Sequence, residues 1–205
     1  MIMTDQDFYT TIAKSGNAEF KDRGSKFIGY VFPVATVEEF KGRLNEVKKE
    51  HPKATHHCFA YRLGLDGNTW RVSDDGEPSG SAGRPILGQI DSKVLVNTLV
   101  IVVRYFGGTL LGVPGLINAY KTAATLALQT TQLVQKPVEK EFMVQFDYTQ
   151  VNEIMTLVKQ YNCRVVRQEM QLFCNMTIAV PRNRIPELSY KLKEIRDVEL
   201  SPVAG

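Results

Sequence analysis

Two segments of the chain combine chemically active side chains with the glycines that shape a binding site. The first, RVSDDGEPSGSAGRPIL at residues 71–87, contains three carboxylates and three glycines. The second, LVIVVRYFGGTLLGVPGL at residues 99–116, is an apolar run interrupted by Arg104 and followed by glycines. Carboxylates could act as a base or bind a metal, and an arginine near a glycine-rich loop could bind an anion.

Much of the first segment is typical of a turn that leads into a helix. Asp75-Gly76 is a strong turn dipeptide, Pro78 stiffens the residues after it, and Ser79 or Ser81 could cap the next helix. The spacing fits neither a calcium loop nor a Walker loop. Clustered turn carboxylates are more often solvated or salt-bridged than catalytic, and three remain as candidates for a base or a metal ligand: Asp74, Asp75 and Glu77.

Arg104 sits where an unpaired charge would be costly. It shares one strand face with Val102 and Phe106, inside a run that is otherwise apolar on both faces. A buried charge without compensation costs several kcal/mol, so Arg104 needs a carboxylate or an external anion. We favour a bond to Asp74 or Asp75, which would join the two segments into one wall, over direct ligand binding.

The glycines after this strand have two interpretations. Main-chain amides at a helix start could bind a phosphate or carboxylate near Gly107 and Gly108, with Lys121 as the nearest basic residue of the helix. Alternatively, the glycines only permit a tight turn and close packing.

The His56-His57-Cys58 run does not form a metal site. Successive strand residues point to opposite faces, so His56 and Cys58 face one way and His57 the other. We therefore expect no metal, and we expect His57 or His56 to line a polar surface.

The elements that position these residues indicate an α+β protein with two domains. In residues 1–136 we expect helices on one side of a sheet, and Thr36 with Glu39 is a capping-box signature for the helix over residues 36–51. From Val138 the order is β-α-β-β-α-β, which indicates a ferredoxin-like domain over residues 137–205, with Pro137 at the boundary. The other expected elements of the first domain are strands at 25–34, 55–63 and 98–106 and a helix at 116–129.

Composition and charge narrow the functional classes. Hydrophobic residues make up 43% of the chain, and no run is long enough for a membrane helix. The first residues lack a secretory signal, and three cysteines without a C-x-x-C pair indicate packed, reduced thiols, so we expect a cytoplasmic protein. Residues 1–136 hold 16 Lys and Arg against 13 Asp and Glu, and no acid lies between Asp91 and Glu139, which favours an anionic partner.

Three motifs resemble those of the IMPACT family in its bacterial, YigZ-type form. They are HPKATHHCFAYRL, SDDGEPSGSAGRP and VVRYFGGTLLGVPGL, in this order and at these separations. The resemblance implies that the first domain has the fold shared by a small-subunit ribosomal protein, the fourth domain of elongation factor G and the GHMP kinases. It also implies that the ferredoxin-like domain resembles the last domain, domain V, of elongation factor G.

In eukaryotic relatives the family is tied to translational control through the kinase that senses amino-acid starvation. Those relatives carry an N-terminal partner-binding domain that we do not expect in this chain. We expect a non-catalytic protein that binds RNA or the ribosome, with a translation factor as a further partner and no cofactor or membrane. The alternative is an enzyme that acts on a phosphorylated small molecule through the glycine loops.

The candidate residues for nucleic-acid or anion binding combine charge, stacking and exposed main chain. They are Arg104, Tyr105, Phe106, Gly107, Gly108, Lys121, Arg84 and His57. The wall beside them consists of Asp74, Asp75, Glu77 and Ser81.

Overall fold

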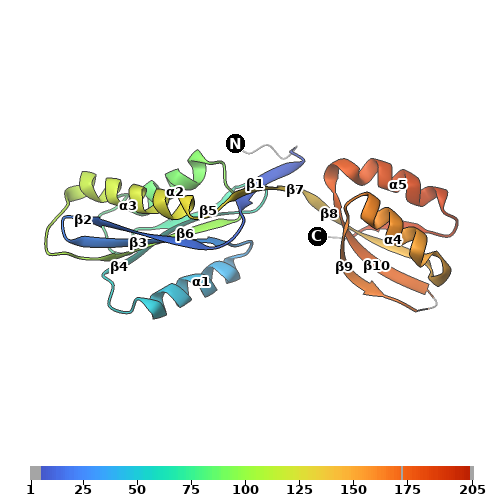
Figure 1. Ribbon diagram of the computed structural model, residues 1–205, viewed down its shortest axis with the longest axis horizontal. Helices are drawn as coiled ribbons and strands as arrows, with labels where there is room; N and C mark the ends of the chain where they lie inside the picture. The colour runs from blue at the N-terminus through green and yellow to red at the C-terminus, as the bar shows by residue number, and fades with distance from the viewer. Residues whose placement is uncertain (1–5, 172, 204–205) are drawn as a thin grey trace. The chain divides into compact units, whose positions relative to one another are not determined.

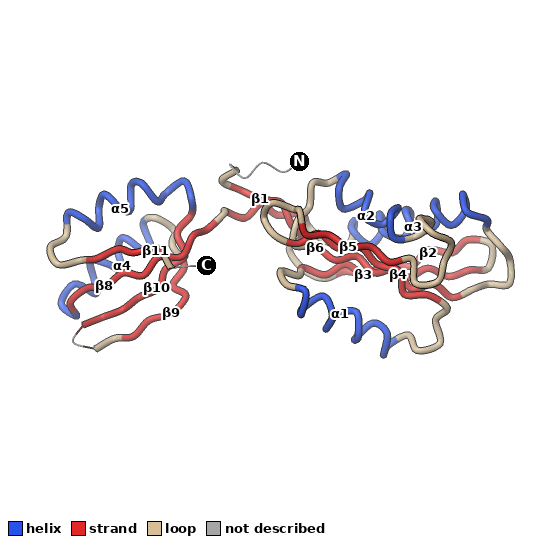
Figure 2. The backbone as a smooth tube through the Cα atoms, turned by 180° about the vertical axis from the view of Figure 1, so that it is seen from behind, coloured by secondary structure: helices blue, strands red, loops and turns tan. Residues whose placement is uncertain are grey.

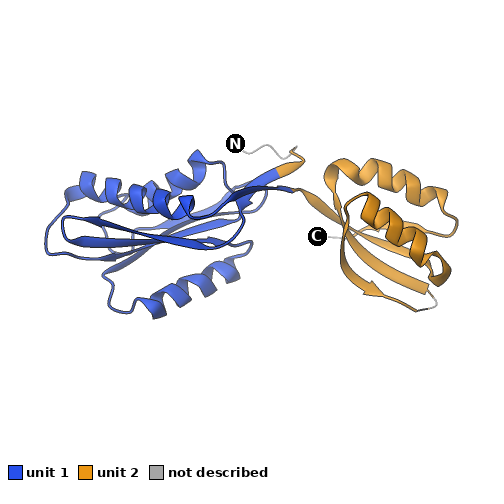
Figure 3. Ribbon diagram, viewed as in Figure 1, with its two compact units in different colours: residues 1–5, 9–136 blue, residues 6–8, 137–205 orange. Residues whose placement is uncertain are grey.

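The chain forms two compact units (Figure 3). The computed structural model describes residues 6–171 and 173–203. The first unit contains residues 9–136, and the second contains residues 6–8 together with the chain from Pro137 onward. Each unit has its own core, so each buries its apolar side chains independently.

A five-stranded antiparallel sheet runs through the first unit. The strand order is β2-β3-β6-β4-β5, so β6 lies at the centre and β2 and β5 form the edges. Two short strands, β1 (Phe8–Ile12) and β7 (Leu133–Pro137), pair separately. The strands of the large sheet are β2 (Gly16–Asp22), β3 (Ser25–Pro33), β4 (His56–Leu63), β5 (Thr69–Ser73) and β6 (Thr98–Tyr105).

Helices cover both faces of this sheet, so the prediction of helices on one side is wrong. Helix α1 (Val37–Glu50) lies on one face, and α2 (Gly83–Ser92) and α3 (Gly112–Gln129) lie on the other (Figure 1 and Figure 2). Ile101 of β6 packs in a core with Phe40 of α1, while Val102 packs with α2 and α3. A strand covered on both faces needs apolar residues on both sides, which explains the apolar run of residues 99–103 before Arg104 in β6.

The helix ends show how the sequence sets the boundaries. The Thr36 side chain accepts a hydrogen bond from the N–H of Glu39 at 3.1 Å, so the predicted cap of α1 is confirmed. The Glu39 carboxylate accepts from the N–H of Ala35, one residue before the standard capping-box position. Helix α3 begins at Gly112, four residues before the predicted start, because Pro114 fits within its first turn.

The second unit has the predicted element order β-α-β-β-α-β. Its antiparallel sheet has the order β11-β8-β10-β9, and both helices cover one face (Figure 1). Val144, Ile154 and Leu188 meet in the core, whereas Met143 and Gln145, on the opposite face of β8, are exposed. The elements are β8 (Glu139–Asp147), α4 (Val151–Gln160), β9 (Arg164–Glu169), β10 (Phe173–Pro181), α5 (Ile185–Glu194) and β11 (Glu199–Pro202).

Two general expectations can be checked in the described residues. None of their helices is both long and apolar enough to cross a membrane. All three cysteines are free thiols, and Cys58 and Cys174 are buried, as expected for packed cysteines.

Candidate nucleic-acid interface

Arg104 and Glu77 form a buried ion pair on the α2/α3 face of the first sheet. Arg104 Nη1 lies 2.6 Å from Glu77 Oε1, and their side chains are only 5% and 4% exposed. The two motifs are therefore joined, but the expected partners, Asp74 and Asp75, were wrong. Asp75 and Gly76 adopt positive φ values of 42° and 90°, and this turn directs Glu77 back toward the strand.

Two further side chains contact the Glu77 carboxylate, and a third contacts one of these two. Tyr120 of α3 donates a hydrogen bond to Oε1 at 2.7 Å, and His56 Nε2 lies 3.7 Å from the same atom. The thiol of Cys58 lies 3.4 Å from the Tyr120 hydroxyl. Burial raises the pKa of both Tyr120 and Cys58, so both stay neutral and Cys58 is no ready nucleophile.

Asp74 performs the capping role that was predicted for Ser79 or Ser81. Its carboxylate accepts hydrogen bonds from the N–H groups of Gly80, Ala82 and Gly83 at 2.8–3.0 Å, at the start of α2. Burial acts to raise the pKa of Asp74, but these bonds outweigh it and lower the pKa below the ordinary value. Ser81 instead donates to the carbonyl of Pro78. Asp74 is therefore a structural anion.

Asp75 fixes both histidines, which lie on opposite faces as predicted. Its carboxylate accepts from the main-chain N–H of His57 at 2.6 Å, and its carbonyl accepts from His56 Nδ1 at 2.7 Å. His57 is buried on the α1 face, where its Nε2 donates to the carbonyl of His51. Burial lowers the pKa of His57, so this side chain is a neutral structural group away from the interface.

The residues after Arg104 form an exposed tip at the end of β6. The Phe106 side chain is 48% exposed, and the Arg104 guanidinium lies over its ring, 5.6 Å from the centroid. Phe106 N–H donates to Thr55 Oγ1 at 3.3 Å. The main chain of Gly107 packs directly against Gly24 in the β2–β3 turn, leaving no room for a side chain at position 107. Gly107 is therefore required for packing. Together with the bond from Phe106 to Thr55, this contact joins the β2–β3 turn, the segment before β4 and the loop after β6.

Two exposed basic residues stand in the segments that contact Gly107 and Phe106, and the sequence patterns pointed to neither. Arg23 directly precedes Gly24, and Lys53 lies two residues before Thr55. They are far from Phe106 in sequence, so only the contacts of Gly107 and Phe106 reveal the grouping. We define the tip as Arg23, Lys53, Phe106, Gly107 and Gly108.

The candidate residues Tyr105, Lys121 and Arg84 are not part of this tip. Tyr105 faces the α1 side, where its hydroxyl lies 2.9 Å from His51 Nδ1. Lys121 is exposed on α3, and Arg84 is exposed on α2 with its guanidinium 4.8 Å from the Trp70 ring centroid. Within the tip, Gly108 adopts a φ of 87°, and a Cβ at this position would meet nothing within 4 Å.

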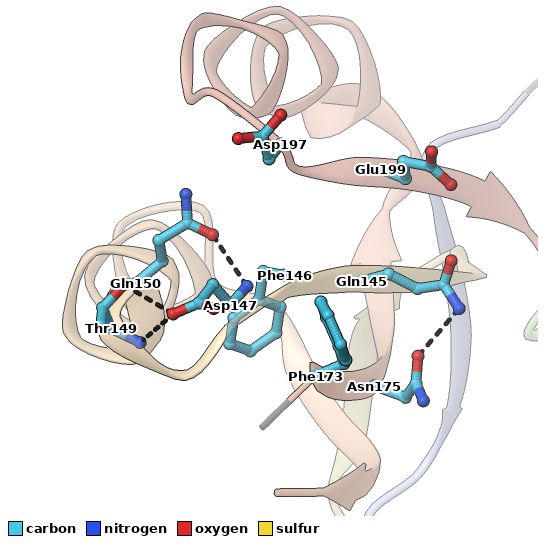
Figure 4. A pocket seen from close by; sticks show the side chains of 9 residues that line it. All are labelled: Gln145, Phe146, Asp147, Thr149, Gln150, Phe173, Asn175, Asp197 and Glu199. Atoms are coloured by element: carbon cyan, nitrogen blue, oxygen red, sulfur yellow. Dashed lines mark hydrogen bonds between the residues drawn. The ribbon is translucent and has the colours of Figure 1, made fainter. Parts of the chain in front are cut away.

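A cavity in the second unit is lined by acidic residues, in contrast to the basic residues of the tip (Figure 4). Its volume is about 690 Å³, and its lining includes the carboxylates of Asp147, Asp197 and Glu199 but no basic residue. Hydrogen bonds from the N–H and hydroxyl of Thr149 lower the pKa of Asp147, so that acid stays charged. This cavity does not suit a phosphate backbone. Over the described residues, no group of three or more His, Cys, Asp or Glu side chains could hold a metal ion.

Comparison with known proteins relates both motifs of the first unit to one family. The family model of the Impact N-terminal domain matches residues 23–128, which include the acid wall and the tip. The chain is 34% identical over 172 residues to IMPACT family member YigZ of Escherichia coli (strain K12), covering 83% of this chain and 84% of that protein. It is 36% identical over 146 residues to IMPACT family member YvyE of Bacillus subtilis (strain 168), covering 71% and 67%.

A solved structure has a similar arrangement. It is described as the crystal structure of an hypothetical protein, and it superposes with a TM-score of 0.77 at 30% sequence identity. The match covers 97% of this chain and 98% of the other, so it includes both units.

Proposed function

Because the chain belongs to the IMPACT family, we propose that it is a non-catalytic protein that binds RNA or the ribosome and acts in the regulation of translation. The tip of the first unit is the proposed contact surface. A translation factor is a further candidate partner, and the cytoplasm is the proposed location.

The half-exposed ring of Phe106, on a loop that contacts the segments carrying Arg23 and Lys53, is the observation that carries this proposal. A half-exposed aromatic side chain offers a surface on which an unpaired base can stack, and this is worth about 1–3 kcal/mol per base. Arg23 and Lys53, in the two contacting segments, supply positive charge for the phosphates. Single-stranded RNA presents both groups together.

The acids of the wall favour binding over catalysis. The enzyme hypothesis offered Asp74, Asp75 or Glu77 as a base. Asp74 accepts three main-chain hydrogen bonds, Asp75 accepts one, and Glu77 is paired with Arg104. Their contacts fix the loop between β5 and α2, and a base needs a carboxylate free to accept a substrate proton.

We further propose the domain identities that the resemblance implies. Residues 1–136 form the IMPACT-type N-terminal domain, with the fold of the ribosomal protein and the GHMP kinases. Residues 137–205 form a ferredoxin-like domain that resembles domain V of elongation factor G, and the sheet order β11-β8-β10-β9 supports this proposal.

Fluorescence anisotropy of a labelled single-stranded RNA, measured over a salt series, tests the proposed function. Phe106→Ala is expected to weaken binding at least 5-fold, which corresponds to about 1 kcal/mol of lost stacking. Arg23→Ala and Lys53→Ala are expected to reduce the slope of log K against log salt by about 0.7 each, since each removes one phosphate contact.

Matched controls come from the second unit. Phe173 is 75% exposed and Lys140 is exposed, so Phe173→Ala and Lys140→Ala remove the same kinds of group away from the tip. Both variants are expected to bind RNA like the wild type. Equal losses in the Phe173 and Phe106 variants, or no binding by the wild type at low salt, would contradict the proposal.

A further inference from the structure

We propose that Arg104 is a positioning residue, which holds the Phe106 ring in place for a base and does not itself contact phosphate. This inference rests on the proposed function and assigns separate roles to the basic residues of that surface. Arg104 orders the stacking surface from inside, whereas Arg23 and Lys53 meet the phosphates from outside.

The N–H groups of the Arg104 side chain point into the protein. Nη1 donates to Glu77 at 2.6 Å, and Nη2 donates to Ser25 Oγ at 3.3 Å. Nε is buried with no hydrogen-bond partner among the described residues. Arg104 is only 5% exposed and its charge is matched by Glu77, so it offers a phosphate neither a solvent-accessible donor nor a net charge.

Ser25 links this buried pair to the tip. Its Oγ accepts hydrogen bonds from Arg104 Nη2 at 3.3 Å and from the main-chain N–H of Gly107 at 3.2 Å. Ser25 is fully buried, so neither bond competes with solvent. Since Gly107 follows Phe106 directly, the hydroxyl of Ser25 fixes the main chain that carries the ring.

The guanidinium also supports the ring itself. It lies over both Phe27, at 5.5 Å, and Phe106, at 5.6 Å from the centroids. Phe27 is fully buried, whereas Phe106 is 48% exposed. Arg104 thus lies over one part of the Phe106 ring and leaves the exposed part for a base, with cation–π attraction holding the ring in place.

Ser25→Ala tests this role because it removes only the linking hydroxyl. RNA affinity is expected to fall about 3- to 10-fold, while the salt slope stays at the wild-type value because no phosphate contact is lost. In a double-mutant cycle, the loss from Ser25→Ala is expected to disappear when Phe106 is already alanine, because the hydroxyl acts through the ring. Additive losses would overturn the proposal.

A second variant tests Arg104 without leaving a buried charge. Replacing the whole pair, as in Glu77→Leu with Arg104→Met, keeps the interior apolar and filled, which is often tolerated. Its salt slope is also expected to equal that of the wild type. A slope reduced by about 0.7 would make Arg104 a phosphate ligand and overturn the proposal. Ile90→Val, a buried change in α2, controls for a general loss of stability.

Amide hydrogen exchange without RNA separates this inference from the proposed function. Ser25→Ala is expected to speed exchange at Gly107, whose N–H loses its acceptor, and at neighbouring residues of the tip, with no change in the second unit. If the wild type binds no RNA but this exchange rises, the proposed function fails and the positioning of the loop stands. Unchanged exchange at the tip would overturn the positioning role.

Discussion

The contact between Gly107 and Gly24 determines the shape of the exposed tip. A Cβ at position 107 would lie well inside contact distance of the Gly24 carbonyl, and main-chain atoms cannot move aside as a flexible side chain can. Gly107 therefore allows the β2–β3 turn to approach the end of β6. The residue type is set by packing, and the ring of Phe106 is exposed as a result.

Gly107→Ala is expected to lower the free energy of unfolding by about 1–3 kcal/mol, because the two turns must separate. Gly88 in α2 is the matched control, since a Cβ there would meet nothing within 4 Å. Gly88→Ala is expected to raise the free energy of unfolding by about 0.5–1 kcal/mol, since alanine favours a helix. Urea unfolding measures both, and equal effects of the two changes would contradict the packing role of Gly107.

At the scale of single residues, the sequence predicted that the charge of Arg104 needs an acidic partner, but it did not predict which acid. A charge inside an apolar strand requires an opposite charge, so a pairing of Arg104 with the acid wall could be expected. The pairing of Arg104 with Glu77 depends on the positive φ of Asp75 and Gly76, which an Asp-Gly dipeptide favours. The dipeptide predicts a turn, but it does not say which of the nearby carboxylates the turn directs toward Arg104. Arg23 and Lys53 could not be found, because loop contacts bring them to the tip.

At the scale of elements, the start of α2 depends on one carboxylate from the loop before it. Asp74 accepts three main-chain N–H groups, whereas Ala82, the residue at the cap position, has no side chain to offer. Asp74 lies eight and nine residues before the N–H groups of Ala82 and Gly83 that it caps. Helix starts are predicted from residues directly before the helix, so the sequence did not reveal this cap.

Asp74→Ala is expected to lower the free energy of unfolding at pH 7 by about 1–2 kcal/mol, through loss of the cap. The pKa of Asp74 is lowered in the folded protein, so its stabilisation is complete above the ordinary value of 3.8 and is lost as pH falls through the lowered value. The difference between variant and wild type should therefore shrink below pH 3.8. Glu38→Ala, on the exposed side of α1, is the control. A difference independent of pH would contradict this account.

The central strand and long helices were predictable, but the edge strands of the first sheet were not. β2 alternates between half-buried and exposed residues and contains Glu19 and Lys21, so its composition is close to that of a polar loop. β5 is short and mostly exposed. The covering of both faces by helices was missed, although the apolar run of residues 99–103 in β6 is the signal for it.

On the scale of the whole molecule, charge divides between the two units. Residues 1–136 have an excess of three basic residues, whereas residues 137–205 hold 9 of each sign, and the cavity of the second unit is lined by acids. The excess of positive charge, which favours an anionic partner, therefore belongs to the first unit. A net charge of +3 is small for an RNA-binding protein, so we expect the proposed binding to be weak and salt-sensitive.

The most direct test of the central claim is to map where RNA touches the protein. A single-stranded RNA containing 4-thiouridine is photo-crosslinked to the full chain, and the modified peptide is identified by mass spectrometry after trypsin digestion. The account predicts crosslinks within residues 105–121, the tryptic peptide that contains Phe106, and their loss in Phe106→Ala. Crosslinks confined to residues beyond Pro137, or crosslinks at the tip that persist unchanged in Phe106→Ala, would contradict it.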